Sequence, residues 1–252
     1  MEMGGLVVKT GRRAGGALLD QLYPPACLAC DAPLGSADGL CAACFSRLRP
    51  ITAPLCPVLG LPFAAALGPD AVSAEAIADP PPFGRARSAV VYTELARALV
   101  GRLKYRDRPE LARFCARLML QAGAELWGPD AVLVPVPLHP LRRLTRRYNQ
   151  STELARALGR LTGLAVAPGL VARRRNTRPQ VGLSGTARRR NLAGAFVARP
   201  EAVLRLAGRR AIVVDDVITT GATVRAVSRV LRDAGLAAVD VVSFARVVAD
   251  EA

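Results

Sequence analysis

The residues with the clearest chemical potential form the string IVVDDVITTGAT, in the last fifth of the chain. Two adjacent carboxylates, Asp215 and Asp216, stand where an apolar run ends, and a hydroxyl-rich loop follows from Thr219 to Thr223. Carboxylates accept hydrogen bonds from vicinal ribose hydroxyls and can anchor a hydrated Mg²⁺. The loop offers hydroxyls and backbone N–H groups at a helix start, where the helix dipole favours a phosphate dianion. The pattern therefore predicts a ribose-phosphate site.

Each member of this loop is a candidate phosphate or ribose contact: Thr219, Thr220, Gly221, Ala222 and Thr223. The glycine allows the backbone to approach a ligand closely. Adjacent residues of a strand point to opposite faces, so one of the two carboxylates can face the site only if the strand turns there. The alternative interpretation is a strand, a turn and a capped helix with two solvated acids.

Four cysteines form a second constellation, in which two Cys-x-x-Cys pairs are separated by ten residues: Cys27, Cys30, Cys41 and Cys44. Each pair can present two thiolates to one tetrahedral Zn²⁺, which predicts a closed structural zinc site. The competing interpretation is two disulfides, which a reducing compartment disfavours. Cys115 lies on an apolar helix face and is interpreted as a packed core thiol.

Strands and helices must alternate to position these residues, and the sequence does so after about residue 82. Short apolar runs predict strands at residues 86–92, 131–137, 209–216 and 239–244. Apolar residues at helical spacing predict the intervening helices, one opening at Pro109 and another stopping at Gly235. This alternation predicts an α/β fold with a doubly wound parallel sheet, whose ligands bind beyond the carboxyl ends of the strands. No internal repeat is evident.

Composition narrows the class of protein. The 252 residues are 51% hydrophobic, enough for a substantial core, and the formal charge is +15. That surface favours anions, either nucleotide phosphates or a nucleic-acid backbone. Lys9, Arg12 and Arg13 interrupt any apolar run of signal-peptide length, and five prolines break the longest uncharged stretch, Pro50 to Pro69. We therefore expect a cytoplasmic protein with no membrane span.

The phosphate loop resembles that of the type I phosphoribosyltransferases. Four motifs taken in order over residues 88–246 resemble, more narrowly, the ComF family: YTELARALVGRLKYRDR, VLVPVPLHPLRRLTRRYNQ, RRNTRPQVGLSGTARRRNLAGAF and VVDDVITTGAT. The resemblance implies a phosphoribosyltransferase-like domain associated with bacterial competence for DNA uptake, preceded by a small cysteine module. One departure is that Arg147 and Tyr148 stand where the family commonly has Gly-Phe before Asn-Gln.

The resemblance also implies roles for residues around the phosphate loop. Residues Val136, Pro137 and Leu138 match the loop near the pyrophosphate position, and Lys104, in the run LKY, also matches the family. Arg143 is a further candidate, because it lies in the basic cluster that follows this loop. A solvated basic face and a surface lysine are the alternatives for these two. Three further residues match a loop that closes over the ribosyl centre: Thr177, Gln180 and Leu183. The arginines around them could instead follow a nucleic-acid backbone.

The shift in composition after about residue 82, the run of three prolines before it and the resemblance together divide the chain into three parts. We expect an N-terminal helix and zinc-ribbon-like module at residues 1–65, a Pro-rich linker at 66–85 and a phosphoribosyltransferase-like domain at 86–252. The family often has a second ribbon with its own cysteine pair. Here Cys56 is retained but Leu59 replaces the expected partner, which argues against a second complete metal site.

Two functions follow as hypotheses. In the first, the protein binds Mg²⁺ with phosphoribosyl pyrophosphate, or a related ribose phosphate, and Asp215 and Asp216 act at the ribose as in an enzyme. In the second, it is a non-catalytic single-stranded-DNA-binding competence factor that uses the pocket as an effector or nucleotide site. Proteins of the DNA-uptake machinery are possible partners in either case, and no residue signals the acceptor substrate.

Overall fold

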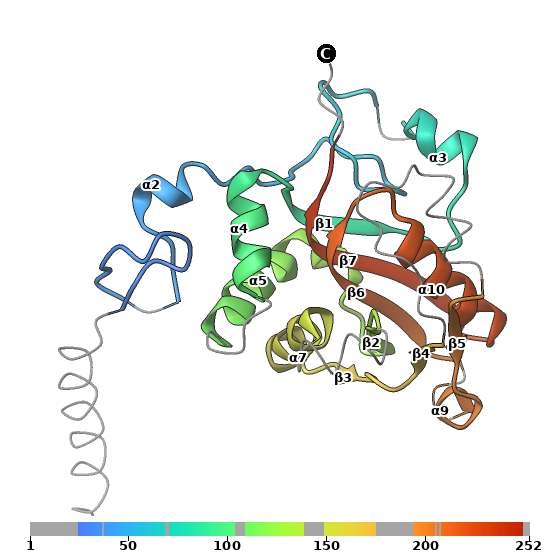
Figure 1. Cartoon of the computed structure of the whole chain (residues 1–252). Helices are drawn as coiled ribbons and strands as arrows, with labels where there is room; N and C mark the ends of the chain where they lie inside the picture. Colours follow the sequence, from blue (N-terminus) through green and yellow to red (C-terminus); the bar gives the residue numbers. More distant parts are fainter. Residues whose placement is uncertain are drawn as a thin grey trace, which may run out of the picture. The chain divides into compact units, whose positions relative to one another are not determined.

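The computed structural model describes residues 25–36, 38–68, 71–103, 109–138, 149–174, 194–204, 206 and 208–248. The chain forms two compact units, residues 1–47 and 48–252 (Figure 1). Residues 48–65, which the sequence groups with the cysteine module, pack with the second unit. The segment expected to be a linker contains a short helix, α3 (Ala74–Ala78). The three-part division of the chain into domains stays a prediction.

The second unit is built on a five-stranded parallel sheet in the order β1-β7-β6-β2-β3. Its strands are β1 (Ala86–Val91), β2 (Ala131–Pro135), β3 (Ala165–Val166), β6 (Arg210–Ile218) and β7 (Ala238–Arg246). The α/β class and parallel sheet predicted from the alternating pattern are confirmed. β6 lies at the centre of the sheet, paired with β2 on one side and β7 on the other.

Helices cover the sheet on both faces, which explains why its central strands are continuous apolar runs. α5 (Pro109–Ala122) and α7 (Gln150–Thr162) pack together and against the sheet, while α10 (Ala222–Asp233) packs against β6 and β7 on another side (Figure 1). Ala211 and Val213 of β6 share a core cluster with apolar residues of α10. Ile212 and Val214, which alternate with them along β6, are equally buried and must point to the opposite face of the sheet.

The remaining elements are short. They are α2 (Ala42–Phe45), α4 (Glu94–Arg102), the 3₁₀ turn η1 (Ala124–Leu126), β4 (Val171–Arg173), β5 (Phe196–Ala198) and α9 (Pro200–Leu204). β4 and β5 pair antiparallel as a two-stranded sheet that contacts α10. Within the described part of the chain, no helix is both long enough and apolar enough to cross a membrane.

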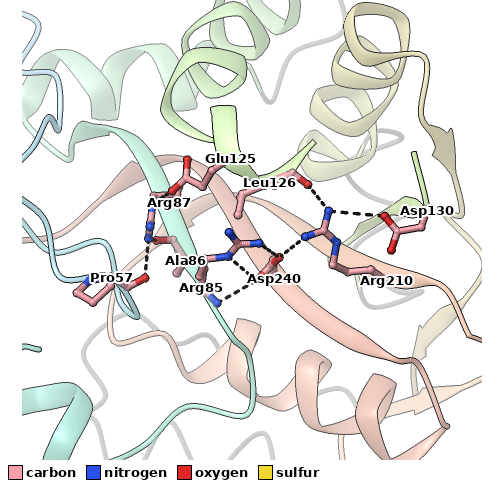
Figure 2. A network of polar contacts seen from close by, with 9 residues as sticks. All are labelled: Pro57, Arg85, Ala86, Arg87, Glu125, Leu126, Asp130, Arg210 and Asp240. Atoms are coloured by element: carbon pink, nitrogen blue, oxygen red, sulfur yellow. Dashed lines mark hydrogen bonds and ion pairs between the residues drawn. The ribbon is translucent and has the colours of Figure 1, made fainter. Parts of the chain in front are cut away.

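A buried acid, Asp240, accepts hydrogen bonds from two arginines at the end of the sheet where its parallel strands begin (Figure 2). Asp240, at the start of β7, is 3% exposed. Arg85 donates to it from its backbone N at 3.0 Å and from Nη2 at 3.0 Å, and Arg210 donates from Nη1 at 3.4 Å. Nearby, Arg87 pairs with Glu125 and donates to the carbonyl of Pro57. The network ties the chain just before β1 to β6 and β7, because Arg85 and Arg210 both donate to Asp240, which is distant from each of them in the chain.

Candidate functional site

The phosphate loop follows directly from the end of β6. The strand includes both acids and ends at Ile218, and α10 begins at Ala222. Between them, Gly221 has φ 72°, a left-handed conformation that strongly favours glycine. A side chain there would meet no atom closer than 3.9 Å, so backbone conformation rather than space requires the glycine. Since the first N–H groups of a helix have no carbonyl partner within it, the start of α10 presents donors to an anion.

The two adjacent carboxylates differ in environment. Asp215 is 7% exposed, and its Oδ1 accepts hydrogen bonds from Ser151 Oγ at 3.0 Å and from the backbone N of Asp216 at 3.0 Å. Burial, followed by the charge of Asp216, raises the pKa of Asp215 well above its ordinary value, although both hydrogen bonds oppose the change. Asp216 is only half-buried, and its Oδ1 accepts from Val217 N at 2.8 Å. Asp216 is therefore the carboxylate with more access to a ligand.

The loop after β2 lies beside the acids because β2 and β6 are parallel neighbours. Val136 N donates to Val214 O at 2.9 Å, which extends the ladder between the two strands beyond the end of β2. Asn149 holds the same loop, because its Nδ2 donates to Val136 O at 3.0 Å while its Oδ1 accepts from Ser151 N at 3.2 Å and caps α7. Val136 and Pro137 are buried, and Leu138 is half-buried. These contacts place the predicted pyrophosphate loop after β2 and beside the end of β6, the strand that leads into residues 219–223.

Sequence analysis did not single out Asn149 or Ser151 for a role. Their only signal in the sequence is their place in the run YNQS, at the start of a helix that follows a basic segment. Five predicted site residues lie outside the described residues: Lys104, Arg143, Thr177, Gln180 and Leu183. Their roles stay predictions.

The cysteine module brings all four predicted ligands together. The sulfur atoms of Cys27, Cys30, Cys41 and Cys44 lie within 4.8 Å of one another, and Cys30 Sγ is 3.7 Å from Cys41 Sγ. Sulfurs bound at about 2.3 Å to a tetrahedral zinc ion lie about 3.8 Å apart, so the cluster fits that ion. With four thiols around one centre, such a site has no open position for chemistry.

Hydrogen bonds within the cluster favour a thiolate at Cys27. Burial raises the pKa of this thiol, but the N–H groups of Cys41, Ala29 and Cys30 together with the Cys30 thiol outweigh burial and lower it to about 6. For Cys44, burial and then the neighbouring sulfurs raise the pKa to about 12. A bound cation would remove this difference, because it favours the ionised form of every ligand.

The other two cysteines are buried outside this cluster. Cys115 is fully buried on α5, where burial raises the pKa of its thiol, as expected of a packed core residue. Cys56 Sγ accepts hydrogen bonds from Leu59 N at 3.4 Å, Ser73 N at 3.4 Å and Ser73 Oγ at 3.3 Å. Leu59 is itself buried. The segment around Cys56 is therefore a packed, hydrogen-bonded turn.

Family models match both parts of the chain. A model described as a double zinc ribbon domain matches residues 18–76, and a model described as a phosphoribosyl transferase domain matches residues 152–252. These matches agree with the parallel sheet, with the strand–loop–helix arrangement at its centre and with the four-cysteine cluster. The fold is thus that of a type I phosphoribosyltransferase-like domain preceded by a small cysteine-rich zinc module.

Several bacterial proteins are similar along most of this chain. The DNA utilization protein YhgH of Salmonella typhimurium is 37% identical over 227 residues, covering 86% of this chain and 95% of that protein. Competence protein F of Haemophilus influenzae is 35% identical over 164 residues, covering 62% and 69%. Competence protein ComFC of Bacillus subtilis is 28% identical over 205 residues, covering 80% and 81%. The chain therefore belongs to the ComF family, with these DNA utilization and competence proteins.

Proposed function

We propose that this protein binds phosphoribosyl pyrophosphate with Mg²⁺, or a related ribose phosphate, and acts in bacterial DNA uptake or utilisation. The observation that carries the proposal is the end of β6, where two acids, a left-handed glycine and the start of α10 follow one another beside the loop after β2. Anionic groups bind at helix starts, and α/β sheets take ligands at the carboxyl ends of their strands.

Each part of the ligand has a place in this proposal. The 5′-phosphate binds the N–H groups and hydroxyls of Thr219 to Thr223. Asp216 accepts hydrogen bonds from the ribose hydroxyls, and Asp215, held by Ser151, supports that end of the strand. The pyrophosphate lies toward Val136–Leu138, with Lys104 and Arg143 as further candidates. Mg²⁺, when bound, neutralises pyrophosphate oxygens, and it commonly takes one or two protein carboxylates, which this end of β6 supplies.

If the protein is an enzyme, the reaction is pentosyl transfer. The bond between the ribosyl carbon and pyrophosphate breaks, pyrophosphate leaves with the electron pair, and an acceptor atom forms the new bond to that carbon. The protein's contribution is to stabilise the charge that develops on the departing group and to exclude water from the ribosyl centre. Thr177, Gln180 and Leu183 are the candidates for covering that centre.

The four-cysteine cluster is proposed to hold one structural Zn²⁺. Its geometry fits the ion, and the matching family model is that of a zinc ribbon. Thiols of this kind stay reduced in the cytoplasm, which is where we expect the protein to act.

The test is a calorimetric titration with phosphoribosyl pyrophosphate, with and without Mg²⁺. We expect binding that requires Mg²⁺ and is lost in the double variant Asp215→Asn, Asp216→Asn. Asp233→Asn is the matched control, because this acid is exposed at the far end of α10 and its loss changes the net charge without touching the loop. Binding that survives unchanged in the double variant would mean that the ligand lies elsewhere.

A second candidate function is favoured by the net charge of +15 together with the names of the similar proteins. In this case the protein binds single-stranded DNA along its backbone and uses the pocket for an effector. Backbone binding releases counterions, so affinity should fall steeply with added salt. Fluorescence anisotropy with a labelled oligonucleotide at several salt concentrations measures this slope, and a flat response excludes the backbone mode.

A further inference from the structure

Residues 54–63 repeat the backbone of residues 25–34, the first turn of the cysteine module. In both turns three backbone hydrogen bonds close around a cysteine, and the residue four positions later has positive φ, 63° at Asp31 and 66° at Gly60. In the first turn the bonds run from Cys27 N to Ala32 O, from Asp31 N to Cys27 O and from Leu34 N to Pro25 O. In the second turn the corresponding bonds run from Cys56 N to Leu61 O, from Gly60 N to Cys56 O and from Phe63 N to Pro54 O. The expectation that the chain has no internal repeat is therefore wrong.

The repeat continues into the second half of each ribbon. Cys41 N donates to Cys27 Sγ at 3.3 Å, and Ser73 N donates to Cys56 Sγ at 3.4 Å. Cys41 precedes α2 and Ser73 precedes α3, each as the N-cap residue. The positions equivalent to Cys27, Cys30, Cys41 and Cys44 are therefore Cys56, Leu59, Ser73 and Ala76. We call residues 54–68 and 71–80 the second ribbon.

Packing replaces metal ligation in the second ribbon. Leu59 and Ala76 are 4% and 5% exposed and belong to the same core cluster as the apolar residues of α10. Cys56 keeps its sulfur as an acceptor of three hydrogen bonds. Since a structural zinc site needs four ligands and three of the four have been replaced, the second ribbon no longer fits the ion.

Two arginines join the second ribbon to the phosphate-loop side of the sheet. Arg225, in the first turn of α10, donates from Nη2 to Asp79 O at 2.8 Å and from Nη1 to Pro80 O at 3.3 Å. Arg246, at the end of β7 and 6% exposed, donates from Nη1 to Leu59 O at 2.8 Å. All three acceptors are main-chain carbonyls, whose positions are set by the folded ribbon and not by side-chain rotation.

Arg225 also belongs to the start of the helix itself. Its backbone N donates to Gly221 O at 2.9 Å, the bond that closes the first turn after the phosphate loop. Thr220 and Gly221 of the loop line one pocket together with Leu59 and Glu75 of the second ribbon. The ribbon thus faces the loop directly, and Arg225 links the two.

The charges around this pocket argue for an interface, not for a second anion site. Arg225 lies 3.5 Å from Asp79 in an ion pair, and Glu75 lines the same pocket as Arg246. Asp79 lies outside the lining of the pocket, but both guanidinium groups of the pocket are already engaged by the second ribbon, Arg225 by Asp79 and Arg246 by the carbonyl of Leu59.

We propose that the second ribbon binds no metal and has a positioning role instead. Through its contacts with Arg225 it holds the first turn of α10 in the orientation that binds the phosphate. The inference rests on the proposed ribose-phosphate function of this loop. Arg225 is a positioning residue, since it acts on the ligand through the helix start. The ordering of the loop before ligand arrives reduces the entropy that binding must overcome.

Two measurements on Arg225→Ala test this role. Hydrogen exchange without ligand should show faster exchange of the amides at residues 219–224, with unchanged rates in β2. Calorimetry with Mg²⁺ and phosphoribosyl pyrophosphate should show binding about tenfold weaker, as expected when hydrogen bonds from a charged donor are lost. Arg225→Lys keeps the charge and one donor group, so it should recover part of both effects.

Arg229→Ala is the matched control, because Arg229 is exposed one turn further along the same helix. Asp79→Asn removes the ion pair but keeps the carbonyl acceptors, so it should behave like the native protein. If Arg225→Ala exchanges and binds like Arg229→Ala, the positioning role is wrong. The exchange measurement needs no ligand, so a native protein that fails to bind phosphoribosyl pyrophosphate would refute the proposed function and leave this result standing.

Metal content tests the other half of the inference. The native protein should contain about one zinc ion per chain, and Cys56→Ala should contain the same amount, whereas Cys27→Ser should lose it. Two zinc ions in the native protein, falling to one in Cys56→Ala, would overturn the assignment of the second ribbon as metal-free.

Discussion

Replacing Asp215 by asparagine separates the effect of this buried acid on the stability of the protein from its role in function. The side chain is almost fully buried, and its Oδ1 accepts from Ser151 Oγ and Asp216 N, each at 3.0 Å. Asparagine has nearly the same size, and its side-chain oxygen can accept the same two hydrogen bonds. Asp215→Asn therefore removes a buried charge and leaves its contacts in place.

The direction of the effect follows from the pKa of Asp215, which burial and then the charge of Asp216 raise above its ordinary value. Between the ordinary and the raised pKa, the folded protein holds the proton more tightly than the unfolded chain does. The contribution of Asp215 to the free energy of unfolding is therefore fully present below about pH 4, and it is lost as the pH rises through the raised pKa. Above that range the native protein carries the cost of a buried carboxylate.

A buried polar group without full compensation costs about 1–3 kcal/mol. We therefore expect Asp215→Asn to increase the free energy of unfolding by about that amount at pH 8, where the acid is forced toward its charged form, and by almost nothing at pH 4. For a unit of this size the gain is roughly 2–4 °C in melting temperature per kcal/mol. The same variant should bind phosphoribosyl pyrophosphate with Mg²⁺ less well, because it removes one of the two carboxylates that the proposal offers to the cation.

Urea unfolding at a series of pH values, with zinc present, measures this difference. Asp216→Asn is the control, since that carboxylate is half-buried and its removal should change stability less. If Asp215→Asn is destabilising at pH 8 and the loss shrinks toward pH 4, then Asp215 is ionised in a favourable environment, and the reasoning from burial is wrong.

Three further substitutions or treatments have expected outcomes. Ser151→Ala removes the hydroxyl donor to the buried acid and should lower the free energy of unfolding by about 1–3 kcal/mol in the same urea assay; no loss would mean that water replaces the donor. Asp240→Ala leaves two arginines without their buried acceptor and should cost about 3–5 kcal/mol by thermal melting, whereas the exposed Asp233→Ala should cost little. A strong zinc chelator should abolish protection of the amides in residues 25–47 in hydrogen exchange and leave β6 protected, and equal loss in both would contradict a zinc site confined to the cysteine module.

The fold and the site's core were readable from sequence because both depend on local patterns. Short apolar runs between amphipathic helices specify a buried parallel sheet, and the expected strand at 209–216 closely matches β6 (Arg210–Ile218). The helix that follows the loop was visible in TTGAT for the same reason, whereas Gly221 was expected to allow close approach of a ligand and its left-handed φ of 72° came only from the structure. The spacing of the four cysteines was sufficient to predict a cluster, because two short turns bring two thiols each.

The family resemblance pointed to a second ribbon at Cys56 and Leu59, but the sequence by itself showed no repeat, because the two turns share few residues. Pro25 and Pro54, Cys27 and Cys56, and Pro33 and Pro62 are the residues shared between the two turns at one constant offset. What is repeated is the set of backbone hydrogen bonds and the positive φ, which many sequences can adopt. In the second ribbon, packing of Leu59 and Ala76 in the core holds the turn, and packing leaves no fixed sequence signature.

By itself the sequence determined an α/β sheet, the loop and helix that follow β6 and a four-cysteine cluster, because each is encoded within a few neighbouring residues. Only the tertiary structure decided which carboxylate is buried and which is more accessible. Asp215 and Asp216 are identical in type and adjacent in the chain, and it is Ser151, a residue 64 positions away, that distinguishes them. The same holds for Arg225, whose partners Asp79 and Pro80 reach it only through folding, since hydrogen bonds over such separations depend on how the elements pack.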